Sequence, residues 1–316
     1  MTTAPLSSRA RAVGAAASSG SGAAAFAELL DLLRPVPQGR SSYRAEAPSV
    51  TWGAPYGGLL VAQALAAASA TVRPGLWVRS LHAYFVQAGD GGAPTDIDVH
   101  TAHEGRSSAW RTVEVIQSER LLLRAEMLFA TDSDGPSHAT APPEAGDPAA
   151  FPNVGDELAG FDDTFRPWTA TSPFDLRYAT PPPRLALDRE PRSTTWVRTA
   201  APAPDDRALA AALLAYASDL CLLDSCLRPH GLWFGSGSAT GFSLDHSMWF
   251  HGPARLDDWL VVDQTSPGMR GGRGLSTAQM HARDGELLAT ATQLGSIRPA
   301  APTPRHAPRP DRQERR

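Results

Sequence analysis

The sequence predicts an α+β fold in which one unit, a long helix followed by antiparallel strands, occurs twice. Two alanine-rich apolar stretches, residues 58–72 and 205–225, are long enough to form helices, and each precedes a series of short runs with strand character. The string SLHAYFVQAG in the first half can be placed beside LDHSMWFHGP in the second, at an offset of about 164 residues. Each helix is therefore expected to cover one face of a curved sheet.

The elements of the first half follow from spacing and turn signals. Residues 26–35 have helical apolar spacing and stop at a proline, and residues 41–50 form a strand or a loop. A glycine-rich turn at 52–58 leads into the helix 58–72. Four strands are expected after it, over residues 78–87, 96–105, 108–117 and 120–130.

The second half repeats this order. A strand at 193–199 precedes the helix 205–225, and Asp205 and Asp206 suit the positive end of its dipole. Four more strands are expected over residues 240–251, 257–266, 273–282 and 286–296. The predicted organisation is a flexible tail (1–25), a first unit (26–135), a linker or extended crossover rich in Pro, Asp, Gly and Ser (136–190), a second unit (191–298) and a disordered Pro/Arg-rich tail (299–316).

Composition argues against several classes of protein. The net charge of −4 shows no basic excess, so no nucleic-acid partner is expected. The longest mostly apolar stretch is shorter than the roughly 20 residues of a membrane span, and the first 25 residues lack the apolar core of a signal peptide. Cys221 and Cys226 cannot form a disulfide framework and suit a reducing compartment, so a cytoplasmic location is expected.

Five segments, in this order, resemble the acyl-CoA thioesterase II family over roughly residues 28–298: YGGLLVAQAL, HAYFVQAGD, YASDL, LDHSMWFH and ATQLGSIR. The string DHSMWFH is the most specific of them. The resemblance implies a double hotdog fold and hydrolysis of fatty acyl-CoA to a free fatty acid and CoA, without a metal, a cofactor or an acyl-enzyme intermediate. It also implies that Asp219, Ser243 and Gln293 together hold the attacking water.

The residues themselves are compatible with these roles. Asp219 lies in an otherwise apolar stretch, and a partly desolvated carboxylate with a raised pKa could take a proton from water. The hydroxyl of Ser243 and the amide of Gln293 can each donate and accept, so both can orient one water. The counterpart of Gln293 in the first half is expected to be Leu128, and this asymmetry predicts one active site per chain, built mainly from the second half.

Three further residues are candidate substrate contacts. Gly57 and Gly58 precede a helix, where bare backbone N–H groups could bind a developing oxyanion. His82 is the third, although its expected equivalence with His246 in the repeat favours a shared structural role, such as a buried histidine bonded to backbone.

The stretch SLDHSMWFHG raises the possibility of a triad or a metal site. Alternation along one continuous strand would put Ser243 and Asp245 on one face and His246 on the other, so these neighbours are not expected to form a Ser–His–Asp triad. The same alternation sends His246 and His251 to opposite faces, which argues against a two-histidine metal site.

Two other functions stay open. A hotdog hydratase or dehydratase needs a histidine paired with an acid, and no histidine lies in or beside YASDL in the sequence. A non-catalytic acyl-binding protein is kept open by two departures from the family pattern, Leu59 in place of glutamine and Ser243 in place of threonine. The acyl chain length and the choice between CoA and acyl-carrier protein are also open. Hotdog units pair through their sheets, and the duplication already supplies one such pair within the chain. A further homodimer or homotetramer is expected, although the sequence does not derive it.

Overall fold

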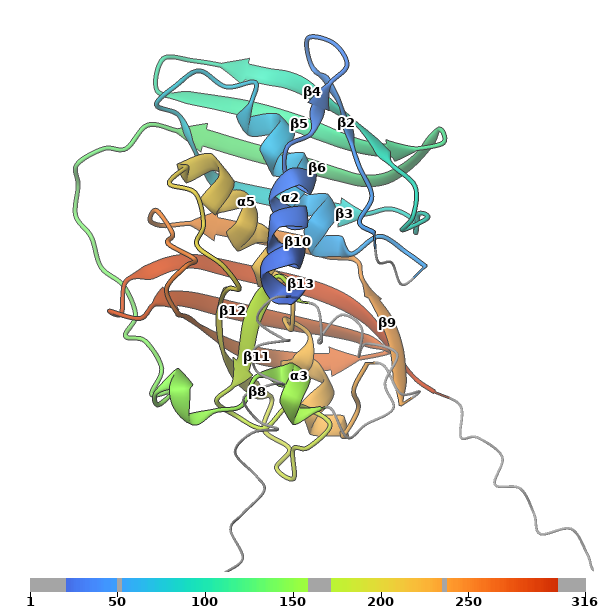
Figure 1. Ribbon diagram of the computed structural model, residues 1–316, viewed down its shortest axis with the longest axis vertical. Coiled ribbons are helices and arrows are strands. Elements are labelled where there is room, and N and C mark those ends of the chain that lie inside the picture. Colours follow the sequence, from blue (N-terminus) through green and yellow to red (C-terminus); the bar gives the residue numbers. More distant parts are fainter. Residues whose placement is uncertain (1–20, 50–52, 159–171, 235–237, 301–316) are drawn as a thin grey trace, which may run out of the picture.

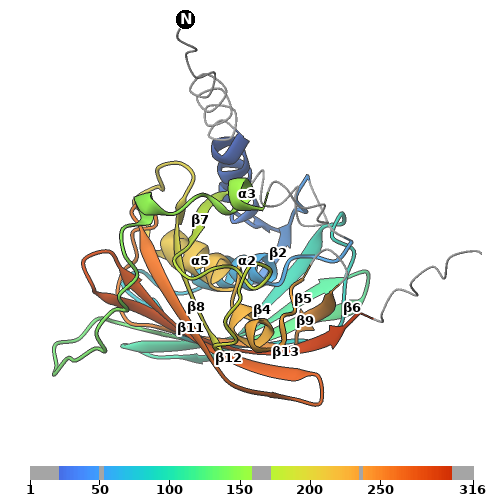
Figure 2. The ribbon, with the colours of Figure 1, turned by 90° about the horizontal axis from the view of Figure 1, so that it is seen from below.

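The two long helices, α2 (Gly57–Ser69) and α5 (Arg207–Ser218), lie side by side on the concave face of one curved sheet (Figures 1 and 2). The computed structural model describes residues 21–49, 53–158, 172–234 and 238–300. The tails expected at residues 1–20 and 301–316 lie outside the described residues. Residues 21–32 form a helix, so helical structure is already present inside the segment expected to be a tail.

The sheet is antiparallel and continuous across both halves of the chain. Its first half contains, in spatial order, β1 (Val36–Pro37), β2 (Ser42–Ala45), β4 (Thr95–Glu104), β5 (Ser108–Gln117), β6 (Arg120–Ala130) and β3 (Trp77–Phe85). Its second half continues with β10 (Asp245–Phe250), β13 (Leu287–Pro299), β12 (Arg273–Ala282), β11 (Leu260–Arg270), β8 (Arg192–Thr199) and β7 (Phe174–Tyr178). The halves meet where β3 pairs with β10, and β9 (Ala239–Ser243) pairs with β13 outside this order. The predicted α+β unit that occurs twice is confirmed.

Small side chains let α2 pack closely against its surroundings. Ala62, Ala64 and Leu65 are fully buried, and the helix contacts both α5 and the strands β3 to β6. Its buried amide, Gln63, donates to the carbonyl oxygens of Leu32 and Glu46, each at 3.1 Å. These hydrogen bonds satisfy the amide and fasten two segments of the first half to α2.

Helix α5 is shorter than the stretch 205–225 predicts. Its N-terminus is capped as expected, because the Asp206 carboxylate accepts from the backbone N–H groups of Ala208 (2.9 Å) and Leu209 (3.0 Å). The helix ends at Asp219, its C-terminal capping residue, and a separate short helix α6 follows (Asp224–Leu227). Asp219 therefore lies at a chain turn and not within a helix.

The segment 136–190 contains more structure than a linker. It carries a 3-10 helix η1 (Pro148–Ala150), a short helix α3 (Val154–Glu157) and β7, which pairs with β8 and extends the sheet. The strand β7 was missed in the sequence.

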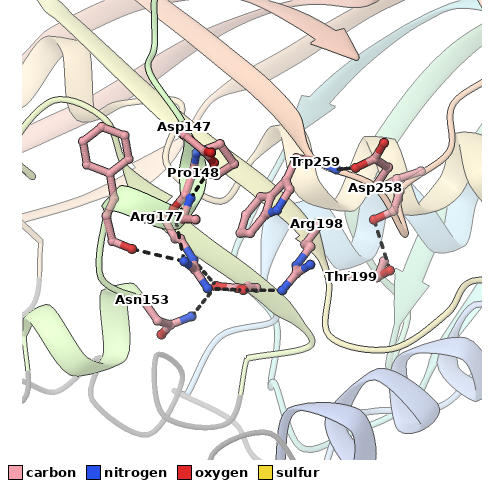
Figure 3. A network of polar contacts seen from close by, with 12 residues as sticks. Asp147, Pro148, Asn153, Arg177, Arg198, Thr199, Asp258 and Trp259 are labelled. Carbon is pink, nitrogen blue, oxygen red and sulfur yellow. Dashed lines mark hydrogen bonds and ion pairs between the residues drawn. The ribbon is translucent and has the colours of Figure 1, made fainter. Parts of the chain in front are cut away.

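Polar contacts fasten this crossover to the second half (Figure 3). Asp175 of β7 accepts from Arg177 (3.0 Å), from Arg198 of β8 (3.2 Å) and from Asn153 beside α3 (2.8 Å). The Trp259 ring lies 5.0 Å from the guanidinium of Arg177 and 4.4 Å from that of Arg198. Burial raises the pKa of Asp175, but these hydrogen bonds and positive charges outweigh burial and hold the pKa below its ordinary value.

The expected strand 240–251 is broken into β9 and β10 at Leu244. The Leu244 N–H donates to Leu294, its carbonyl accepts from Phe85, and the Asp245 carboxylate accepts from the Leu294 N–H. The break interrupts the alternation of side chains between the two faces of the sheet. Odd- and even-numbered residues therefore do not keep the same faces before and after Leu244.

Candidate active site

Gly57 and Gly58 lie at the start of α2, directly against the end of α5. A Cβ atom on Gly57 would lie 2.9 Å from Oδ2 of Asp219 and 3.1 Å from the Phe85 ring. A Cβ atom on Gly58 would lie 2.8 Å from the carbonyl oxygen of Tyr216. Only glycine therefore lets the N-terminus of α2 approach the carboxylate this closely.

Asp219 is partly buried where the positive end of α2 meets it. Burial raises the pKa of its carboxyl group. The electrostatic interaction with His246 and hydrogen bonds with Gln293, with the Gly58 backbone N–H and with Ser243 lower the pKa, but it stays above its ordinary value. The carboxylate is therefore a stronger base than an exposed aspartate.

A chain of hydrogen bonds runs beside Asp219. The Gln293 amide nitrogen donates to Ser243 Oγ at 2.7 Å, and Gln293 Oε1 lies 2.5 Å from Nδ1 of His246. His246 Nε2 lies 2.9 Å from Ser218 Oγ. Because Oε1 is only an acceptor, Nδ1 of His246 carries the proton in this contact. Gln293 and His246 are each 1% exposed, so their orientations are fixed by these partners.

The three residues expected to hold the water, Asp219, Ser243 and Gln293, are thus brought together, and His246 joins them. The expectation that His246 points away from Ser243 is wrong, because it assumed one continuous strand. The break at Leu244 lets the side chains of Ser243 and His246 both reach Gln293. They do so through the amide and make no direct Ser–His–Asp triad.

His82 lies elsewhere. Its neighbours Leu81 and Ala83 face the core, so His82 points to the outer side of the sheet, where it is exposed. Its Nδ1 is 3.0 Å from Ser247 Oγ, and its ring lies 5.3 Å from that of Trp249. The structure does not bring His82 to Asp219, and the expected equivalence of His82 with His246 is wrong.

The first-half counterpart of Gln293 also differs by one residue. Met127 is fully buried and pairs with Leu81, as Gln293 meets His246, whereas Leu128 faces the other side of the sheet. The asymmetry itself remains, with an apolar side chain in the first half and an amide in the second. Leu59, at the position where glutamine was expected, is buried in the core.

Neither cysteine is suited to nucleophilic catalysis. Both are free and buried, and burial raises the pKa of the Cys221 thiol to about 12 and also raises that of Cys226. In the described ranges, no three His, Cys, Asp or Glu side chains are grouped so that they could hold a metal ion. None of the helices described there is long and apolar enough to cross a membrane.

Comparison with known proteins places the chain in a family. A profile of the acyl-CoA thioesterase N-terminal domain matches residues 46–130, and one of the C-terminal domain matches residues 143–297. The chain is 32% identical over 264 residues to acyl-CoA thioesterase 2 of Haemophilus influenzae, covering 81% of this chain and 92% of that protein. It is 33% identical over 260 residues to acyl-coenzyme A thioesterase 8 of Rattus norvegicus, covering 77% and 80%.

Solved structures agree with the sequence comparisons. The acyl-CoA thioesterase II TesB2 from Mycobacterium marinum matches with a TM-score of 0.72 at 30% identity, covering 86% of this chain and 99% of that one. A hot dog fold protein from Alicyclobacillus acidocaldarius matches with a TM-score of 0.71 at 20% identity, covering 87% and 98%, and supports the fold alone. The chain therefore belongs to the acyl-CoA thioesterase II family of double hotdog thioester hydrolases.

Proposed function

We propose that the protein hydrolyses fatty acyl-CoA with a water molecule held by Asp219, Ser243 and Gln293. The observation that carries this proposal is the meeting of a carboxylate of raised pKa with a hydroxyl and an amide at the N-terminus of α2. A base, two orienting groups and a helix start are the parts that hydrolysis of a thioester needs.

The reaction follows from these positions. Asp219 accepts a proton as the water oxygen attacks the thioester carbonyl carbon. The backbone N–H group of Gly57 lies at the positive end of α2, where it can stabilise the oxyanion of the tetrahedral intermediate, whereas the Gly58 N–H is donated to Asp219. Collapse of the intermediate breaks the C–S bond, and the proton passes from Asp219 to the CoA thiolate. The products are the free acid and CoA.

His246 acts as a positioning residue in this proposal. Its Nδ1–H holds Oε1 of Gln293, so the amide nitrogen is directed toward Ser243. Ser218 at the end of α5 fixes the other ring nitrogen. The amide therefore enters the reaction already oriented, which reduces the entropy lost in the transition state.

A hydratase function is the second candidate, and His246 is the observation that favours it, since a histidine does lie beside the end of α5. Both ring nitrogens are occupied, and the side chain is 1% exposed, so it is badly placed to remove a proton from a substrate carbon. A change of enoyl-CoA absorbance in the presence of the protein would support the hydratase and count against the thioesterase.

Release of free thiol from acyl-CoA substrates of increasing chain length tests the proposal, with acyl-carrier-protein thioesters in parallel. We expect Asp219→Asn to lower kcat at least about 100-fold, because it removes the base. Asp224→Asn is the matched control. Burial raises the pKa of the Asp224 carboxyl to about 7. This carboxyl accepts a hydrogen bond from the Tyr178 hydroxyl at 2.6 Å, outside the proposed site. Binding of acyl-CoA by the native protein without turnover would instead identify an acyl-binding protein.

The two free and buried thiols also support work in a reducing, cytoplasmic compartment. In the described part of the chain, most of the core is one large cluster of apolar side chains across both helices and the sheet, beside two smaller clusters in the second half.

A further inference from the structure

The duplication creates a second junction between helix ends that corresponds to the one around Asp219, and we call each of these two junctions a mouth. Helix α2 ends at the capping residue Ala70, as α5 ends at Asp219. Val78 pairs with Phe129 immediately before a bulge in β3, as Ser243 pairs with Gly295 immediately before the break at Leu244. The second mouth therefore lies between the end of α2 and the start of α5.

Four polar positions of the catalytic mouth are apolar in the second one. Asp219, Ser243, His246 and Gln293 correspond there to Ala70, Val78, Leu81 and Met127. Ser69, the counterpart of Ser218, keeps its hydroxyl, but these four positions hold no carboxylate, hydroxyl, imidazole or amide. Helix α2 begins at Gly57, which has no side chain, whereas helix α5 begins at Arg207. A guanidinium group therefore belongs to the helix start at the second mouth, where the first mouth has only backbone. The second mouth cannot perform the hydrolysis proposed for the first.

A cavity of about 200 Å³ nevertheless opens at this place. Its walls are largely apolar and include Val72, Leu76, Val78, Phe129, Leu214 and Phe250. Since a water molecule occupies about 30 Å³, the cavity has room for a short apolar tail.

Three arginines line the same cavity: Arg73, Arg79 and Arg207. Arg207 contacts the Asp132 carboxylate at 2.6 and 2.9 Å, and Arg79 contacts it at 2.7 Å. The guanidinium of Arg207 also lies 4.5 Å from the centre of the Trp77 ring, which holds it in place. Arg73 donates to the carbonyl oxygen of Gly105 at 3.2 Å, and in the part of the chain described by the structure it meets no carboxylate.

Asp132 shows which ligand chemistry these arginines accept. Its side chain is 61% exposed, and such exposed ion pairs are weak, so an incoming carboxylate can take its place. Three cations against one carboxylate leave this rim with a positive excess, and guanidinium groups bind carboxylates through paired N–H donors.

We propose that this second mouth is a non-catalytic site for a fatty acid of short or medium chain length, with its carboxylate on Arg79 and Arg207 and its tail in the cavity. The anion site is inferred from the geometry of the arginines and the cavity alone. Its interpretation as a site for the fatty-acid product rests on the proposed function.

Calorimetric titration of the full chain with octanoate, acetate and 1-octanol tests the proposal. We expect octanoate to bind at least tenfold more tightly than acetate, which lacks the tail, and than 1-octanol, which lacks the charge. Arg207→Gln should weaken octanoate binding at least tenfold. So should Ala211→Phe, which fills the cavity and keeps the charges. Arg192→Gln is the control, since Arg192 pairs with Asp263 on another part of the surface. Equal binding of octanoate and 1-octanol would overturn the proposal.

Crystals grown with 8-bromooctanoate locate the ligand through the anomalous signal of bromine. A bromine peak among Phe129, Leu214 and Phe250 is the expected result, and Asp219→Asn should leave it unchanged. A peak found solely beside Asp219, or no peak in the cavity, would refute the second site. Because this readout does not involve hydrolysis, failure of the thioesterase proposal would not change it.

Discussion

Asp219 determines how activity should depend on pH. Burial is the largest influence on this carboxyl group and raises its pKa, and only the ionised form can accept a proton from water. Activity is therefore present above the raised pKa and is lost as the pH falls through it. We expect kcat/KM for thiol release to show an acidic limb with a midpoint above about 3.9, the ordinary aspartate value. A limb with the same midpoint in Asp219→Asn would contradict this assignment.

The same shift predicts an effect on stability. The folded protein binds the proton of Asp219 more tightly than the unfolded chain, so ionisation of this group destabilises the fold as the pH rises through the raised pKa. Asp219→Asn removes that cost, and at neutral pH we expect its melting temperature to equal or exceed that of the native protein. A large decrease would mean that the lost activity reflects misfolding.

Replacing His246 distinguishes a role in orienting the Gln293 amide from a role in core packing alone. His246→Leu introduces the residue found at the corresponding position, Leu81, but leaves Oε1 of Gln293 without a donor in a buried place. An unsatisfied buried acceptor costs about 1–3 kcal/mol, which favours rotation of the Gln293 amide away from Ser243. If the correctly oriented amide costs that much more to form, kcat falls about 10- to 100-fold with a much smaller change in KM.

His246→Asn supplies an N–H close to the position of Nδ1 and should restore part of kcat. Equal losses in the leucine and asparagine variants, or a loss expressed only in KM, would count against positioning of the amide by His246.

The sequence identified three of the four polar residues of the candidate site, and the fourth was misplaced for a definable reason. Alternation of side chains along one strand through Leu244 sends His246 away from Ser243, and nothing in SLDHSMWFHG marks a break at Leu244. A signal did exist in the repeat. Aligning Phe85 with Phe250 in place of Trp249 puts Leu81 opposite His246, and an inward-facing apolar residue opposite a histidine indicates a special position.

At the scale of elements, the sequence predicted strands well where local patterns decide them. The strands β5, β6 and β12 begin and end at the predicted residues. The strand β7 was missed because five residues in a proline-rich segment carry no local signal, and the strand exists through its pairing with β8. The helix α5 was predicted too long because the apolar residues LCLL continue beyond Asp219, and packing decides where the chain turns.

Asp175 should control how firmly the crossover is attached. Asp175→Asn removes the charge that Arg177 and Arg198 contact, in a side chain that is only 16% exposed. Hydrogen bonds to charged groups contribute roughly 1.5–3 kcal/mol, so we expect the free energy of unfolding to fall by about 2 kcal/mol at neutral pH. Thermal unfolding followed by circular dichroism measures the change.

The pH dependence provides a check on this variant. The folded-state pKa of Asp175 is lowered, so its contribution to stability is present above the unfolded value and is lost as the pH falls through the lowered one. The difference between the native protein and Asp175→Asn should therefore shrink in acid. A difference that stays constant down to low pH would point to packing and not to charge.

At the scale of the whole molecule, the repeat was the most informative sequence feature, because it predicted both the architecture and the single active site. The sequence could not show that β3 and β10 pair at the centre of one continuous sheet, since that pairing joins residues far apart in the chain. Side chains of both halves meet on the outer face of the β3–β10 pairing, so this face is available for contacts with another copy of the chain.

Three aromatic residues on that outer face predict that the protein self-associates. Tyr84 on β3 is 67% exposed, Trp110 on β5 is 44% exposed and Trp249 on β10 is 37% exposed. In the sheet β3 pairs with β10, and β6 lies between β3 and β5. Exposed aromatic residues gathered on one face are typical of protein interfaces. We expect light scattering after size-exclusion chromatography to give a multiple of the 33.5 kDa chain mass, as a homodimer or homotetramer.

Replacing Tyr84 and Trp249 together by lysine should shift the protein to 33.5 kDa, because desolvating two charges in an interface is costly. Val36→Lys is the control, since Val36 is also exposed (52%) but lies on β1 at the end of the sheet. A native mass of one chain would exclude self-association, and an unchanged mass in the double variant would exclude this face. Since Asp219 lies on the concave side of the sheet, the lysine variant should keep its thiol-release activity, so loss of assembly and loss of catalysis can be measured separately.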